Sequence, residues 1–224
     1  MKNLRKNDRN RPRRGAFITF EGPEGAGKST QVRMLLAALE AREPGSAVAT
    51  REPGGTPLAE KLRALFKYGL DGETIDPRTE LLLIEAGRIQ HIEQFIRPAL
   101  AAGKVVICDR FTDSTLAYQG AGRGIGAELV KPLNDFACAG ITPDLTFILD
   151  IPVERGLKRA AERSPENSTR DRLENERREF HERLRREFLA LAAADPERCA
   201  VIDASGTPEE VHREIWRICN ERGL

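Results

Sequence analysis

A glycine-rich stretch at residues 22–29 has the sequence GPEGAGKS, which matches the spacing GxxxxGK[ST]. Glycines at this spacing let the backbone wrap around phosphate oxygens, with N–H groups and a helix N-terminus pointing at the anion. Lys28 adds a positive charge near the β- and γ-phosphates of a nucleotide, and Ser29 supplies a hydroxyl oxygen for Mg²⁺. The predicted ATP-binding residues are Gly22, Pro23, Glu24, Gly25, Ala26, Gly27, Lys28, Ser29 and Thr30.

A nucleotide-binding loop alone does not separate an ATPase, a GTPase and a kinase, but two arginines favour a kinase. Arg51 follows the apolar run 47–50, and Arg110 follows the apolar run 105–108. Two guanidinium groups can hold a monophosphate through charge-assisted bidentate hydrogen bonds. Asp109, at the end of its apolar run, is placed to hold Mg²⁺ through water. Each arginine alone has the simpler interpretation of a surface ion pair.

The elements that must position these residues alternate along the chain. Apolar runs at 16–20, 47–50, 105–108, 145–150 and 200–203 predict buried strands, and each gap between them is long enough for a helix. After the first run, Val32, Leu35, Leu36 and Leu39 share one helix face. We therefore predict an α/β P-loop NTPase fold in which a parallel sheet of about five strands has helices on both faces. Ligands of such sheets bind beyond the carboxyl ends of the strands.

Five motifs in this order resemble the thymidylate kinase family. They are FEGPEGAGKST, TREPGGTPLAEKLR, DRFTDSTLAYQGAGRGI, TPDLTFILD and DRLE, and the resemblance covers roughly residues 16–219. It implies phosphorylation of dTMP to dTDP by ATP with Mg²⁺, a step toward dTTP, in a homodimer. By the same resemblance, Arg51 and Arg110 hold the acceptor phosphate, and Glu24 lies near the acceptor sugar and phosphate.

The resemblance also assigns the pocket for the acceptor base. Arg88 corresponds to the arginine that reads the thymine edge, Ser114, Thr115 and Gln119 line the pocket, and Tyr118 crowds the sugar 2′ position. Residues 80–100 are helix-like, and Ile84 and Arg88, four residues apart, can face one ligand. The simpler interpretations are a helix-surface charge for Arg88 and core packing for Tyr118.

The chain departs from the family pattern at three positions around the base. Ile84 stands where the family usually has a phenylalanine that stacks on thymine, which forfeits about 1 kcal/mol of aromatic stacking. Gly87 replaces the usual polar residue before the arginine, and Phe111 replaces the usual tyrosine or histidine. A kinase for another pyrimidine or deoxynucleoside monophosphate therefore stays open as an alternative.

A charged segment at 154–188 contains an irregular stretch, 164–170, between two predicted helices. A solvated charged face is one interpretation, and a lid at about 158–175 is the other. Some bacterial members of the family carry a catalytic arginine in the P-loop, where this chain has Gly25, and others supply it from the lid. The lid candidates are Arg172, Arg163 and Arg170, and an arginine closing over ATP would stabilise the transferring phosphoryl group.

The first 14 residues carry seven basic side chains and one acidic one, a net charge of +6, which leaves −5 for residues 15–224 because the total is +1. We expect a disordered basic arm followed by one kinase domain at 15–224. The arm has no apolar stretch of a secretory signal, and no window is apolar enough for a membrane helix, so we expect a cytoplasmic protein. The four cysteines lie far apart and predict buried free thiols.

Two further function classes stay open on the sequence alone. A P-loop switch or regulatory protein would bind nucleotide without an acceptor, which leaves Arg51 and Arg110 unexplained. A nucleic-acid-dependent ATPase would be recruited by the basic arm, and deletion of residues 1–14 would then abolish RNA or DNA binding. In the kinase interpretation, which requires no nucleic acid, the same deletion leaves activity intact.

Overall fold

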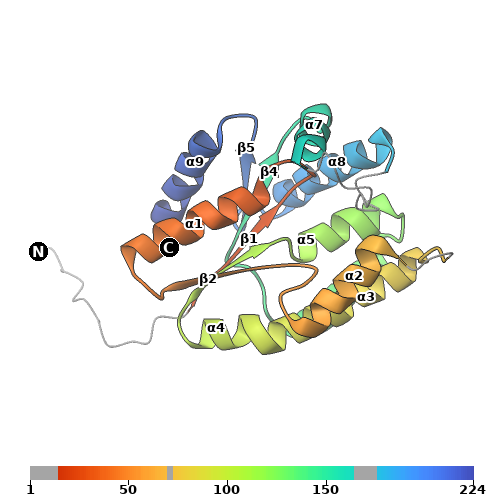
Figure 1. The fold of residues 1–224 in the computed structure, drawn as a ribbon, viewed down its shortest axis with the longest axis horizontal. Coiled ribbons are helices and arrows are strands. Elements are labelled where there is room, and N and C mark those ends of the chain that lie inside the picture. The colour runs from red at the N-terminus through yellow and green to blue at the C-terminus, as the bar shows by residue number, and fades with distance from the viewer. Residues whose placement is uncertain (1–14, 70–72, 164–175) are drawn as a thin grey trace, which may run out of the picture.

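Five strands form a parallel sheet in the order β2-β3-β1-β4-β5 (Figure 1). The structure is a computed structural model that describes residues 15–69, 73–163 and 176–224. The strands are β1 (Phe17–Glu21), β2 (Ala47–Arg51), β3 (Val105–Asp109), β4 (Leu145–Asp150) and β5 (Cys199–Asp203). All five predicted strands are confirmed, with bounds that differ by one residue at most.

Apolar residues alternate between two faces along the central strands. In β1, Ile18 and Phe20 pack into one core cluster, while Phe17 packs into another on the opposite face. Likewise Ile107 and Val106 of β3 enter these two clusters. Because successive side chains of a strand point to opposite faces, a strand covered on both faces is apolar throughout. Helices must therefore cover both sides of this sheet.

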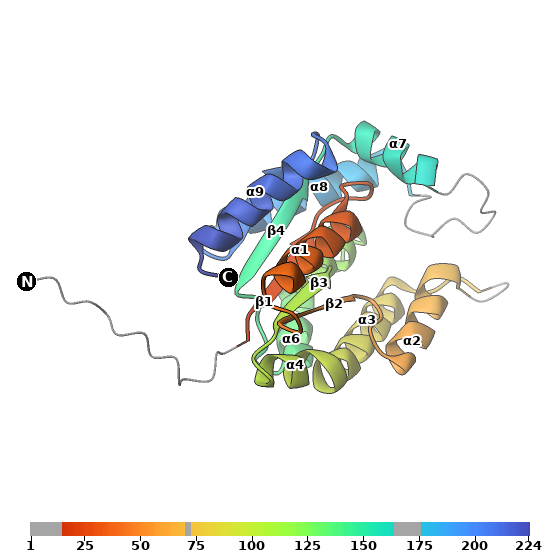
Figure 2. The same cartoon turned by 60° about the vertical axis from the view of Figure 1, so that its left-hand side comes forward.

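Helices α1 (Lys28–Arg42) and α9 (Pro208–Glu221) pack together on one face of the sheet (Figures 1 and 2). Val32, Leu35 and Leu39 of α1 are buried there, which confirms the predicted apolar stripe. The opposite face is covered by α8 (Arg178–Ala194), which packs on β4 and β5, and by α4 (Arg97–Ala101), which packs on β3.

Two helices, α2 (Pro57–Tyr68) and α3 (Pro77–His91), pack against each other beside the sheet. Each begins with a capping side chain followed by proline at the first helical position, Thr56 before α2 and Asp76 before α3. This cap places the start of α3 three residues earlier than predicted. The predicted helix 80–100 continues as a π-helical turn, η1 (Ile92–Ile96), and then as α4.

The remaining helical segments lie between β3 and β4 and directly after β4. They are α5 (Thr112–Thr115), the π-helical segment η2 (Leu116–Gly122), α6 (Ala127–Cys138) and α7 (Val153–Arg163). The first residues of the predicted lid, 158–163, belong to α7. The rest of the lid and the N-terminal arm, 1–14, lie outside the described residues.

Two predictions about the chain as a whole can be compared with the structure. All four cysteines are buried and free, as predicted. Within the described ranges, no helix combines the length and the apolar character needed to cross a membrane.

Candidate active site

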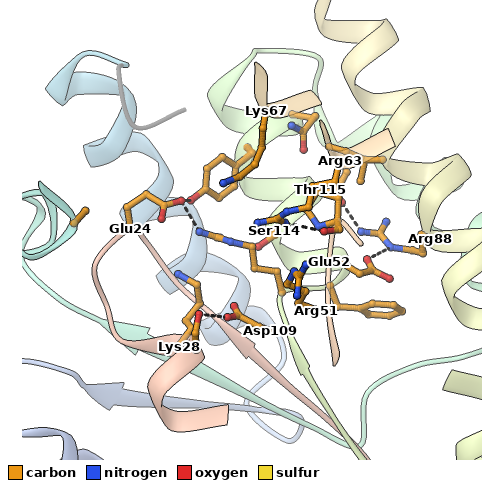
Figure 3. Close-up of a pocket in the computed structure, with 18 of the residues that line it drawn as sticks. Glu24, Lys28, Arg51, Glu52, Arg63, Lys67, Arg88, Asp109, Ser114 and Thr115 are labelled. Atoms are coloured by element: carbon orange, nitrogen blue, oxygen red, sulfur yellow. Dashed lines mark hydrogen bonds and ion pairs between the residues drawn. The ribbon is translucent and has the colours of Figure 1, made fainter. Parts of the chain in front are cut away.

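A cleft of about 300 Å³ lies at the carboxyl ends of β1, β2 and β3 (Figure 3). Figure 3 shows Glu24 and Lys28 toward one end of the cleft and Arg88 at the other. The lining residues from the predicted site are Glu24, Gly25, Gly27, Lys28, Ser29, Arg51, Ile84, Arg88, Asp109, Arg110, Ser114, Thr115, Tyr118 and Gln119. All eight predicted acceptor residues therefore share one cleft with the P-loop.

The P-loop leaves β1 through Gly22, whose φ of 130° is a conformation that favours glycine. A Cβ at this position would lie 2.4 Å from the carbonyl oxygen of Leu149, so no larger residue fits. The Lys28 Nζ donates hydrogen bonds to the carbonyl oxygens of Gly22 (2.9 Å) and Pro23 (2.7 Å). Burial, together with the charge of Arg110, lowers the pKa of Lys28 to about 8. An anion in the loop would favour the charged form of this lysine.

The Ser29 hydroxyl lies at the start of α1 and donates a hydrogen bond of 2.5 Å to Oδ2 of Asp109. Asp109 is the last residue of β3 and lines the same cleft. Hydroxyl and carboxylate oxygens are the ligands that Mg²⁺ prefers in proteins. Both predicted metal ligands therefore meet at the P-loop end of the cleft.

Arg110 follows β3 in a left-handed backbone conformation, with φ 72°. Its Nη2 contacts Oε1 of Glu24 at 2.5 Å, and its Nη1 donates to Oγ of Ser114 at 3.1 Å. The guanidinium also lies over the Tyr118 ring, 4.8 Å from the ring centroid. These contacts hold the Arg110 charge beside the P-loop.

Arg51 ends β2 and lines the cleft with its side chain about half exposed. Its Nη2 contacts both carboxylate oxygens of Glu60, at 2.8 and 2.9 Å. An exposed pair of this kind is weak, on the order of 0.2–1 kcal/mol, so a phosphate can compete for the guanidinium. Arg51 and Arg110 therefore flank the same space as Lys28, as the sequence predicted.

Glu24 connects the P-loop to Arg110 and Tyr118. Besides Arg110, its Oε1 accepts a hydrogen bond of 2.9 Å from the Tyr118 hydroxyl. Tyr118 is 4% exposed and packs edge-on against Phe180 and Phe188, so it is a core residue as well as a lining residue. The core-packing interpretation of Tyr118 is therefore confirmed, and its role beside an acceptor sugar stays a prediction.

Arg88 is 2% exposed, so the interpretation as a helix-surface charge is wrong. Its Nε donates to Glu52 at 2.8 Å, its Nη1 to Glu85 at 2.9 Å and to Asn134 at 2.6 Å, and its Nη2 to Thr115 at 2.8 Å. Burial opposes ionisation of Glu52, but Arg88 and His91 lower its pKa. These hydrogen bonds fix the guanidinium plane at the far end of the cleft.

The other residues around Arg88 line the end of the cleft opposite the P-loop. Ile84 is 7% exposed and packs with Tyr118 in one apolar cluster. The guanidinium carbon of Arg88 lies over the Phe111 ring, 5.1 Å from the ring centroid. The Gln119 amide donates to Glu80 at 2.8 Å, and that bond holds its side chain in the lining.

Several lining residues were missed by sequence reasoning. Glu52, Pro53, Arg63, Lys67 and Ala160 also line the cleft, as does Phe111, which the sequence had marked only as a departure from the family pattern. Arg63 and Lys67 come from α2 and line the same cleft as Ser114 and Thr115 (Figure 3). Their spacing of four residues places both cations on one helix face, which is the signal that would have found them.

Glu21, the buried last residue of β1, was missed as well. It accepts a hydrogen bond from the Phe111 amide, the residue after Arg110, at 2.7 Å. Burial, and then the charge of Asp113, raises the pKa of Glu21 to about 8. A carboxyl group at the buried end of an apolar strand is unusual and marks the position, although it does not reveal the distant contacts that give Glu21 its role.

Some predicted residues lie elsewhere. Gly22, Pro23, Ala26 and Thr30 are part of the P-loop and the start of α1 but are not among the lining residues. Arg163 is the last residue of α7. Arg170 and Arg172 lie outside the described residues.

Comparisons with known proteins agree with this geometry. The family model for thymidylate kinase matches residues 20–215. Relatives named thymidylate kinase include one from Synechococcus sp. (strain JA-2-3B'a(2-13)), 50% identical over 92% of this chain and 95% of its own length. One from Solidesulfovibrio magneticus is 51% identical over 90% and 97%. The crystal structure of thymidylate kinase from Ehrlichia chaffeensis matches with a TM-score of 0.73 and 36% identity, over 92% of this chain and 98% of that one.

Proposed function

The chain belongs to the thymidylate kinase family, and on that premise we propose that it transfers the γ-phosphoryl group of ATP to dTMP, giving dTDP and ADP. One observation carries the proposal. Lys28 of the P-loop lines the same cleft as Arg51 and Arg110, so a triphosphate and a monophosphate can be held facing each other. A nucleotide switch without an acceptor has no use for the second pair of cations.

In the proposed reaction, an oxygen of the acceptor phosphate attacks the γ-phosphorus of ATP, and the bond from that phosphorus to the β–γ bridging oxygen breaks. The acceptor oxygen is already anionic, so no strong base is required. Arg51 and Arg110 orient the acceptor phosphate, and Lys28 stabilises charge on the donor phosphates. Glu24, which holds the Arg110 guanidinium, orients this cation toward the acceptor.

The residues at the P-loop end fit a nucleotide-bound Mg²⁺. Ser29 and Asp109 place two oxygen donors side by side. Across residues 15–69, 73–163 and 176–224, no group of three or more His, Cys, Asp or Glu side chains could hold a metal. This donor set suits Mg²⁺, which is commonly bound by one or two protein oxygens together with substrate phosphates. When bound, the ion supplies charge neutralisation on the β- and γ-phosphates.

At the base end, the fixed Arg88 guanidinium is a hydrogen-bond donor for a carbonyl edge of thymine. Ile84 offers an aliphatic surface to the face of the base, and Ser114, Thr115 and Gln119 complete the pocket. Tyr118, held through its hydroxyl by Glu24, occupies space beside the sugar and favours a deoxyribose. The lid arginines Arg172 and Arg163 stay predictions for stabilising the transferring phosphoryl group.

A second candidate is phosphorylation of another pyrimidine or deoxynucleoside monophosphate. Ile84 favours it, because an aliphatic side chain covers a base face with less selectivity for thymine than an aromatic ring. A panel of dTMP, dUMP, dCMP, UMP, CMP and AMP, with ADP release as the readout, separates the two. We expect the highest kcat/KM with dTMP, and a higher value with another acceptor would replace the proposal by this candidate.

We also propose that the enzyme is a homodimer. Apolar side chains two turns apart are exposed on α3, at Leu82 and Ile89, and on α6, at Leu129 and Phe136. The two helices pack against each other, so these residues belong to neighbouring elements. Exposed apolar side chains gathered on adjacent helices are typical of a surface that another protein covers. Symmetric pairing with a second copy is the commonest way to cover one.

A further inference from the structure

Arg110 must adopt a conformation that its residue type disfavours. Its φ of 72° lies in the left-handed region, which costs an L-residue with a side chain free energy. Such strain persists only where surrounding contacts determine the backbone, and it is concentrated at functional sites. The Arg110 amide donates to the carbonyl oxygen of Phe20 at 2.9 Å, which fixes the start of the turn.

The end of the turn is fixed by the buried carboxyl group of Glu21. Its Oε1 accepts from the amide of Phe111 at 2.7 Å and from the amide of Ser114 at 3.2 Å. Phe111 is the N-cap residue of α5 and Ser114 lies in its first turn, where no helical carbonyl is available to these amides. One buried acceptor therefore holds the backbone immediately after Arg110.

The same carboxyl group also reaches the Arg110 side chain through one intermediate. Its Oε2 lies 2.5 Å from Oγ of Ser114, and that hydroxyl accepts from Nη1 of Arg110 at 3.1 Å. Glu21 is fully buried and does not line the cleft, so it cannot touch a ligand there. Its influence must pass through Arg110 and Ser114.

We propose that Glu21 is a positioning residue that sets the Arg110 guanidinium for the acceptor phosphate, an inference that rests on the proposed kinase function. The hydrogen bonds to Phe111 and Ser114 hold the backbone turn, and the Ser114 hydroxyl orients the side chain. A residue with only a structural role would change stability, whereas this one changes acceptor binding in particular.

Two substitutions at position 21 test the proposal in the full-length enzyme. Glu21→Met fills similar space but removes every acceptor, and Glu21→Gln keeps an oxygen for the two amides. We expect Glu21→Met to raise the KM for dTMP by on the order of tenfold to a hundredfold, because buried donors lose their partner. The KM for ATP should change less than twofold, and Glu21→Gln should restore most of the dTMP affinity.

Asp113→Asn is the matched control. Asp113 is a buried carboxylate on the same short helix, but it pairs with Arg198 at 2.6 and 3.0 Å rather than with the Arg110 turn. We expect it to lower the free energy of unfolding and leave the KM for dTMP within twofold. An equal rise in KM for Asp113→Asn and Glu21→Met would mean that any loosening of α5 has this effect, which overturns the proposal.

Crystal structures of the substrate-free variants separate this inference from the proposed function. We expect the Arg110 guanidinium of Glu21→Met to leave the Glu24 carboxylate, whether or not dTMP is the acceptor. If the wild-type enzyme does not phosphorylate dTMP, the proposed function fails and the position of Arg110 still decides the role of Glu21. An unmoved Arg110 with an unchanged dTMP KM overturns the inference.

Should Glu21→Met not fold, Ser114→Ala tests the link from Glu21 through the Ser114 hydroxyl to Arg110. An unchanged dTMP KM for Ser114→Ala also overturns the inference.

Discussion

At the scale of single residues, Lys28 is a cation whose surroundings oppose its charge. Its pKa in the free enzyme is lowered to about 8 by burial and by Arg110. The protonated fraction therefore falls as pH rises through 8, while bound phosphates favour the charged form. We expect the Kd for ATP, measured calorimetrically, to be flat below pH 8 and to rise by up to about tenfold per pH unit above it.

Lys28→Ala is the control for this pH dependence. It should bind ATP weakly at every pH and show no turnover, because the charge on the donor phosphates is lost. Glu21→Gln should keep the pH dependence, which excludes the other group with a pKa near 8. A wild-type Kd that stays constant to pH 9.5 would show that the charge of Lys28 does not titrate in this range.

The residue at position 84 determines whether an aliphatic or an aromatic side chain covers the face of the proposed base. Ile84→Phe adds a ring that can stack on thymine, which is worth about 0.5–1.5 kcal/mol. We expect the KM for dTMP to fall by about two- to tenfold and selectivity over dCMP to rise. Ile84→Leu, which changes shape without adding a ring, should leave both quantities within twofold. A higher dTMP KM for Ile84→Phe would show that its neighbour Tyr118 leaves no room for the ring.

Site residues could be predicted from the sequence where a motif fixes both residue type and spacing. Lys28, Arg51 and Arg110 follow strand ends, and all three line the cleft. Glu21 and Glu52 could not be found in this way, because their roles arise from contacts with residues 36–93 positions away. Such contacts depend on the order of strands in the sheet, which local patterns do not encode.

At the scale of elements, the strands were predictable because each is a short apolar run, and the central strands β1, β3 and β4 are buried along most of their length. The helix ends and the π-helical turns were less so. The π-helical segments η1 and η2 change the phase of the helical turns, and no distinct residue pattern marks them. The strand order β2-β3-β1-β4-β5 also lay beyond the prediction, which gave only the number of strands and their direction.

The P-loop and α7 approach each other backbone to backbone. A Cβ at Gly25 would lie 1.9 Å from the carbonyl oxygen of Gly156, and a Cβ at Gly156 would lie 2.4 Å from that of Glu24. We expect Gly25→Ala to displace α7 or the loop, lowering the free energy of unfolding by about 1–3 kcal/mol through overpacking, in addition to backbone strain. Urea denaturation and kcat measure the two effects.

Gly45→Ala is the matched control for backbone strain. Gly45 has a similar left-handed φ, 80° against 71° for Gly25, but a Cβ there would meet open space. Its cost should be about 1 kcal/mol, with no change in kcat. An equal loss in the free energy of unfolding for the two variants would mean that α7 moves without cost and that its contact with Gly25 does not stabilise the fold.

At the scale of the whole molecule, the apolar side chains on α3 and α6 make the oligomeric state testable. Phe136 is 75% exposed. We expect Phe136→Glu to place a charge in the proposed dimer interface and to shift the mass in solution from two chains to one. Light scattering after size-exclusion chromatography measures that mass.

Val201→Glu is the control, because Val201 is also apolar and 49% exposed but lies on the edge strand β5. It should leave the mass unchanged. A wild-type protein with the mass of one chain would refute the dimer, and dissociation by Val201→Glu instead would move the interface to the other edge of the molecule.

The contact between Gly25 and Gly156 also bears on how such enzymes can diverge. With this packing, an arginine at position 25 requires α7 to move away from the P-loop, so it is costly as a single substitution. The position of the proposed catalytic arginine would then change together with the spacing between the P-loop and α7. Ancestral reconstructions should accordingly show changes at positions 25 and 156 on the same branch.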